Sequence, residues 1–138
     1  MQHGKLRVVP VLLAVLGVTV FGADKAPQNY QDAMKDLGAF AQAVPKAVEA
    51  EDYDAITKFA NSAKSAFGII EEYWSKKTDP AAVKSAQDGI KAAADLGVTA
   101  NLKSKEGAEY SAKIITETCM GCHAAHREKA ADGTFQIR

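Results

Sequence analysis

Apolar residues recur at steps of three and four along most of the chain, and this spacing limits the fold more than any other feature. The first such segment runs from about Pro27 to Ala50, and the second from about Asp52 to Trp74. The third runs from Pro80 to about Leu96, and the fourth from about Ser104 to Ala131. No stretch alternates with period two over enough residues to indicate a sheet. The spacing therefore predicts an all-α fold.

Residues that start and stop helices separate the four segments. Asp52 and Asp79 precede the second and third segments as expected N-caps, and Pro80 suits the first position of a helix. Gly97 is expected to stop the third helix and to open a loop. Pro45 is expected to kink the first helix or to end its regular part. Four amphipathic helices with short connections predict an antiparallel up-and-down four-helix bundle.

The apolar stripes are predicted to face the centre of this bundle. In the first two helices the stripes comprise Tyr30, Met34, Leu37, Ala41, Val44, Val48, Ile56, Phe59, Ala63, Phe67, Ile70 and Trp74. In the third helix the stripe comprises Val83, Ala86, Ile90 and Ala94.

The N-terminal segment differs from the rest of the chain. Residues 1–22 begin with two basic residues and no acid, and Val8–Phe21 then carries no charge over 14 residues. Small residues follow, so a secretory signal peptide cut before Ala23 is expected, with residues 23–138 as one domain. An uncleaved anchor is the alternative, and the shortness of the run disfavours it because a spanning helix needs about 20 residues. Both predict export, and the expected location is the periplasm.

The charge of the chain gives no indication of a nucleic-acid or anionic-membrane partner. The full chain has 17 basic and 17 acidic residues. Removal of the predicted signal peptide takes away Lys5 and Arg7, so 15 basic residues remain against 17 acidic ones, a net charge of −2. Steering of a partner by net charge would therefore be weak.

The motif CMGCH, residues 119–123, contains both cysteines of the chain. A disulfide between them would close a very small loop and constrain the unfolded chain little, and redox dithiols of this spacing normally open a helix in a thioredoxin-like sheet fold. A zinc site would have to use Cys119, Cys122, His123 and His126. Four ligands on two turns of one helix cannot surround one zinc ion unless the helix unwinds.

A covalently attached c-type haem accounts for the motif better than either alternative. C-x-x-C-H is the attachment signal for such a haem, and attachment takes place outside the cytoplasm, as the predicted export requires. Cys119 and Cys122 lie three residues apart on one side of a helix, which suits two vinyl groups on one porphyrin edge. His123 is expected to be the proximal iron ligand. One haem c is predicted, bound through both cysteines.

These features resemble the class II cytochromes c, the cytochrome c′ family, whose four-helix layout places C-x-x-C-H on the last helix. The family tail C-x-x-C-H-x-x-aromatic-R reads CMGCHAAHR here, so Arg127 matches and His126 replaces the aromatic residue. In the family this arginine lies beside the proximal histidine. A first-helix pattern, R-x-x-x-M-K-x-L-G, reads YQDAMKDLG here, with Tyr30 in place of an arginine that often contacts a haem propionate.

The resemblance implies a role for Met34, which falls where low-spin members place their sixth, thioether ligand. A methionine that only fills space in the core is the other interpretation, since Met34 lies on the apolar stripe. If Met34 binds iron, the expected function is a periplasmic electron carrier between redox partner proteins. If it does not, the alternative is a five-coordinate cytochrome c′ that binds small gases such as NO or CO. Peroxidase-like catalysis is disfavoured because the apolar stripe of the first helix offers no acid–base group on the distal side. Dimers through the first two helices are common in the family.

Overall fold

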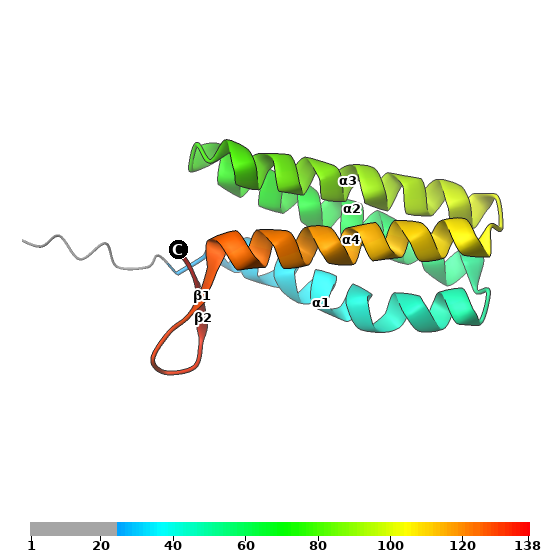
Figure 1. The fold of residues 1–138 in the computed structure, drawn as a ribbon, viewed down its shortest axis with the longest axis horizontal. Coiled ribbons are helices and arrows are strands. Elements are labelled where there is room, and N and C mark those ends of the chain that lie inside the picture. Colours follow the sequence, from blue (N-terminus) through cyan, green and yellow to red (C-terminus); the bar gives the residue numbers. More distant parts are fainter. Residues whose placement is uncertain (1–24) are drawn as a thin grey trace, which may run out of the picture.

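The computed structural model describes residues 25–138, which form four helices and a short β-hairpin (Figure 1). The helices are α1 (Gln28–Glu49), α2 (Tyr53–Lys76), α3 (Pro80–Asn101) and α4 (Lys105–His126). Strands β1 (Arg127–Lys129) and β2 (Phe135–Ile137) pair antiparallel. The predicted signal peptide and its cleavage position lie outside the described residues.

The four helices form an antiparallel up-and-down bundle, as predicted (Figure 1). Each helix packs against the next one in the chain, and α4 also contacts α1. The start of α1, the turn between α2 and α3, and the end of α4 therefore lie at the same end of the bundle (Figure 1). The C-terminal hairpin extends from this end.

The three turns between helices share one backbone design. Each has three residues, and the middle one adopts a left-handed conformation: Glu51 (φ 54°), Thr78 (φ 55°) and Lys103 (φ 53°). A left-handed residue after a helix ends it and lets the chain reverse. The third residue of each turn then caps the next helix.

The predicted N-caps at Asp52 and Asp79 are confirmed. A carboxylate oxygen of Asp52 accepts a hydrogen bond from the backbone N–H of Ala55 at 3.0 Å. Asp79 accepts two, from Ala81 and Ala82, each at 3.0 Å. Each cap satisfies N–H groups that have no partner within the helix.

One predicted interruption of a helix was wrong. Helix α3 continues past Gly97 to Asn101, because Leu96 and Ala100 are buried and a glycine inside a helix costs only about 1 kcal/mol. The glycine also lies close to α2, since an added Cβ would sit 3.7 Å from that of Ala60. Helix α1 continues through Pro45, which is exposed, to Glu49, so Pro45 does not end this helix.

The fourth helix ends earlier than predicted, at His126 rather than Ala131. Arg127 has extended backbone angles (φ −124°, ψ 134°) and begins β1. The turn of the hairpin contains Asp132 and Gly133, whose φ of +85° suits glycine. An Asp-Gly pair is a strong hairpin signal, so the sequence did contain an indication of this turn.

Most of the predicted core residues are buried, with some differences in detail. Ala41 and Ala94 are exposed, whereas Phe40 and Ala93 are buried instead. Partial burial is found for Met34, Phe59, Val83 and Ile90. An α-helix has 3.6 residues per turn, so the sequence alone does not determine which of two adjacent apolar residues faces the core. The predicted stripe can therefore be displaced by one residue.

Candidate functional site

A cavity in the bundle is lined by four of the predicted site residues. Cys119, Cys122 and His123 reach it from α4, and Met34 reaches it from α1. The cavity encloses about 290 Å³, including the mouth that opens to solvent. The remaining lining residues come from all four helices and are Leu37, Phe67, Ile70, Ser85, Ala86 and Thr118.

The three α4 residues share one side of their helix. Positions separated by three and four residues in an α-helix lie on one face, so Cys119 stands beside both Cys122 and His123. All three side chains are partly buried. Met120, which lies between the cysteines, is 59% exposed and does not line the cavity.

Both thiols are free, and their surroundings keep them protonated at neutral pH. Burial, with a smaller contribution from the neighbouring Cys122, raises the pKa of Cys119 to about 11. Burial also raises the pKa of Cys122, and the charge of Asp79 adds to this effect. Reactive redox cysteines have lowered pKa values, so this pair lacks the electrostatics of a redox dithiol.

His123 is held in a neutral form beside Arg127. Partial burial lowers the pKa of His123, and the positive charge of Arg127 lowers it further. Nη1 of Arg127 lies 3.4 Å from Nδ1 of His123. A hydrogen bond donated to Nδ1 places the proton of the neutral ring on Nε2, so metal binding through Nε2 requires that proton to move to Nδ1. The arginine stands beside the histidine, where the resemblance placed it.

Met34 lies on the second turn of α1 and is partly buried. It reaches the cavity from a different helix than the cysteines and the histidine. The bundle thus brings a thioether, two thiols and an imidazole to one cavity, although Met34 and Cys119 are far apart in the sequence. Soft sulfur and imidazole donors of this kind suit iron held in a haem.

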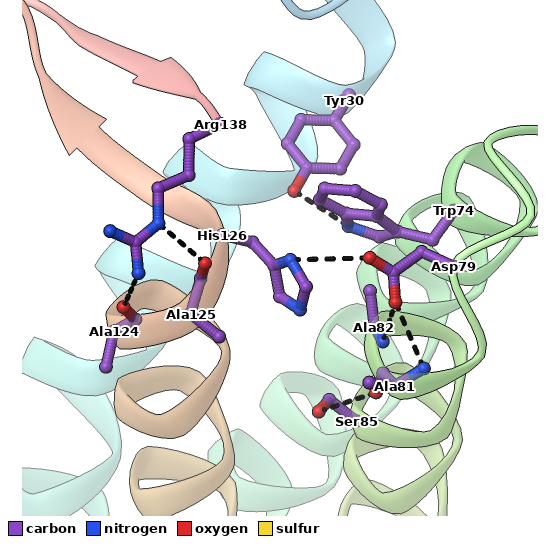
Figure 2. Close-up of polar contacts among 10 residues, drawn as sticks. All are labelled: Tyr30, Trp74, Asp79, Ala81, Ala82, Ser85, Ala124, Ala125, His126 and Arg138. Atoms are coloured by element: carbon purple, nitrogen blue, oxygen red, sulfur yellow. Dashed lines mark hydrogen bonds and ion pairs between the residues drawn. The ribbon is translucent and has the colours of Figure 1, made fainter.

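His126 does not line the cavity, and its ring points toward Asp79 and Trp74 (Figure 2). Its Nδ1 lies 3.6 Å from a carboxylate oxygen of Asp79, and its ring packs on Trp74 with a centroid distance of 4.8 Å. The four cysteine and histidine side chains of this region therefore do not converge on one point. Within residues 25–138, no group of three or more Cys, His, Asp or Glu side chains is arranged to hold a metal ion.

Tyr30 is a core residue and does not contact solvent as an arginine would. The indole N–H of Trp74 donates to the Tyr30 hydroxyl at 3.2 Å (Figure 2). The ring of Tyr30 also packs on that of Tyr73. Burial raises the pKa of Tyr30 to about 12. This position is therefore used to join α1 to α2, and the family contact between an arginine and a propionate has no counterpart here.

One wall of the cavity is fixed by the close approach of α2 and α3. Phe67 lines the cavity and is buried, and its ring lies over Gly89 of α3. A Cβ at residue 89 would sit 2.4 Å from Cε1 of Phe67, closer than real atoms approach. The glycine therefore sets the position of this ring. Nothing in the spacing of the sequence indicated this contact.

The residues of the cavity fit a haem chemically. Two thiols can form thioethers, His123 can bind iron, and the rest of the lining is mostly apolar, as a porphyrin requires. The space that a water-sized sphere can occupy in this cavity is only about 20 Å³, far below the roughly 300 to 1,000 Å³ of ligand pockets. A haem attached here would therefore have to move the helices apart or lie largely outside the cavity.

Comparison with protein-family models, with curated proteins and with solved structures finds no match for this chain. Between residues 25 and 138, no helix combines the length and the apolar character needed to cross a membrane. The geometry of the cavity is therefore the basis on which a function is proposed.

Proposed function

We propose that this chain is a periplasmic c-type cytochrome that carries one covalent haem and passes single electrons between redox partner proteins. The observation that carries the proposal is the meeting of Cys119, Cys122, His123 and Met34 at one cavity. A chain with only these two cysteines uses both of them in a C-x-x-C-H motif, and the fold turns both toward an apolar space. The predicted export of the chain agrees with the site of haem attachment.

Each of these residues has a defined role in the proposal. The sulfurs of Cys119 and Cys122 hold the haem covalently, and Nε2 of His123 binds its iron. Met34 would supply a further iron ligand from α1. Bound haem would supply a one-electron couple between ferric and ferrous iron. Histidine with methionine favours the ferrous state and a high potential.

A five-coordinate protein that binds NO or CO is the second candidate, and the lining of the cavity favours it. Leu37, Phe67 and Ile70 give the space beside Met34 an apolar surface that suits small neutral gases. Met34 is itself only partly buried, so a methionine that packs without binding iron fits the same position. The two candidates differ in one bond, between iron and the Met34 sulfur.

Absorption spectra of the reduced holoprotein, with and without carbon monoxide, test the choice. We expect a sharp low-spin α band that the gas leaves unchanged. The band should become broad, high-spin and sensitive to the gas in Met34→Ala but not in Met120→Ala, which removes an exposed methionine of the same helix turn as the cysteines. A wild-type spectrum that is already high-spin and shifts with the gas would refute methionine ligation and favour the second candidate.

Covalent attachment is tested separately, by haem staining after denaturing electrophoresis. Wild-type protein made together with a haem-attachment system should retain its haem, and Cys119→Ala and Cys122→Ala should hold it weakly or not at all. His123→Ala should lose the native spectrum. Wild-type protein without covalent haem under these conditions would refute both candidates.

A further inference from the structure

The C-terminal hairpin is fixed to the end of α4 by its last residue. The Arg138 side chain donates from Nε to the carbonyl of Ala125 and from Nη2 to that of Ala124, each at 2.7 Å (Figure 2). Its backbone N–H also donates to the carbonyl of His126 at 3.2 Å. The final carbonyls of a helix have no partner within it, so this clamp satisfies them and holds β2 beside the helix.

Further contacts set the register of the hairpin. Arg127 pairs with Ile137 and Lys129 pairs with Phe135, and Ile137 packs against the core of the bundle. In the turn, an oxygen of Asp132 accepts from the N–H and the hydroxyl of Thr134.

This register places the Phe135 ring against Arg127. The two residues are diagonal neighbours across the hairpin, a separation that aromatic and long side chains can bridge. The Cζ atom of Arg127 lies 3.7 Å from the centroid of the Phe135 ring. The same guanidinium lies 3.4 Å from Nδ1 of His123. The ring and the imidazole therefore both contact the guanidinium, and each restricts where it can move.

Phe135 has no other evident reason to occupy its position. It is 59% exposed, a large apolar side chain left mostly in water. Single apolar residues on a protein surface are ordinary. The Phe135 ring, however, covers the guanidinium of Arg127, which would otherwise be surrounded by solvent. A guanidinium that stacks on an aromatic face gains about 0.5–1 kcal/mol at an exposed site, enough to bias its position.

We propose that Phe135 is a positioning residue that holds the Arg127 guanidinium against His123 and thereby raises the reduction potential of a haem iron bound by that histidine. The inference rests on the proposed function. An imidazole that binds iron through Nε2 carries its proton on Nδ1, so Arg127 can no longer donate to that atom. Stacking on Phe135 is then what keeps the charge of Arg127 near the imidazole ring. A fixed positive charge beside that N–H opposes histidinate character and favours the less positive, ferrous iron. Arginine keeps its charge at all relevant pH values, so the effect does not depend on a titration.

Potentiometric titration of holoprotein variants tests the inference. Phe135→Ala and Arg127→Gln should both lower the midpoint potential, and Phe135→Trp should restore a value near that of wild type because it restores a stacking face. Phe135→Ala should lower the potential no further when Arg127→Gln is already present. Lys129→Gln, which removes a positive charge from the same strand, should shift the potential less than Arg127→Gln does.

The outcomes separate this inference from the proposal beneath it. If the Phe135→Ala variant holds its haem covalently and has the midpoint potential of the wild type, the proposed role of Phe135 is refuted. An equal decrease in Phe135→Ala with and without Arg127→Gln would overturn it too, since the ring would then act independently of the arginine. Thermal unfolding of each variant shows whether the bundle is intact. Absence of covalent haem from the wild type would instead refute the proposed function, and the inference with it.

Discussion

Replacing Gly89 by alanine should destabilise the bundle, although the same change at most helical glycines is favourable. Alanine exceeds glycine in helix propensity by about 1 kcal/mol. At residue 89, however, the new Cβ would lie 2.4 to 2.6 Å from three ring atoms of Phe67. The ring is buried, so relief requires movement of α2 against α3 or rotation of the ring into the cavity. Overpacking of this kind costs about 1–3 kcal/mol, which leaves a net loss of about 0–2 kcal/mol.

Gly68 provides the matched control. It lies inside α2, and a Cβ there would meet no atom within 4 Å, so Gly68→Ala should stabilise the protein by about 0.5–1 kcal/mol. Urea unfolding followed by far-ultraviolet circular dichroism compares the two variants. We expect Gly89→Ala to be less stable than Gly68→Ala by about 1–3 kcal/mol. Equal stabilisation by both would refute the close approach of Phe67, as would failure of Phe67→Leu to relieve Gly89→Ala.

Three further predictions concern the ends of the helices. Tyr30 has a pKa of about 12 in the folded protein against 10.0 in the unfolded chain. Its contribution to stability is therefore complete below pH 10 and is lost as the pH rises toward 12. The difference in unfolding free energy between wild type and Tyr30→Phe should change over this range and stay constant below it. Asp79→Ala should cost about 0.5–2 kcal/mol in urea unfolding and Asp79→Asn much less, because asparagine also caps helices; equal losses would contradict the cap. Thr78→Gly should raise stability by about 1 kcal/mol because threonine is strained at φ 55°; a lower melting temperature would count against that turn.

The existence of four helices could be predicted because apolar spacing and capping residues agreed. Asp52 and Asp79 each precede an apolar run, and each caps a helix in the structure. The predicted helix end at Gly97 was wrong because a helix boundary depends on the packing around a glycine as well as on its low helix propensity. Here burial of Leu96 and Ala100 keeps the helix intact. The hairpin was missed because the predicted helix was extended to Ala131, across β1, and the following Asp132–Gly133 pair, which signals a turn, was not used.

The candidate site could be predicted only in part for a similar reason. The spacing of Cys119, Cys122 and His123 determines their common face once the segment is helical. Contacts between distant segments have no local pattern. The sequence therefore gave no sign that Phe135 would stack on Arg127 or that His126 would turn toward Asp79.

The placement of Met34 links the fold to the proposed chemistry. Helix α1 starts and α4 ends at the same end of an antiparallel bundle, so the second turn of α1 lies level with the last turns of α4 (Figure 1). Met34 and His123 therefore line one cavity from two helices. A thioether in that position can close the coordination of a haem iron, whereas a small shift of α1 would leave the iron open to a gas. Under the proposed function, the packing of α1 against α4 would therefore determine whether the protein carries electrons or binds gases.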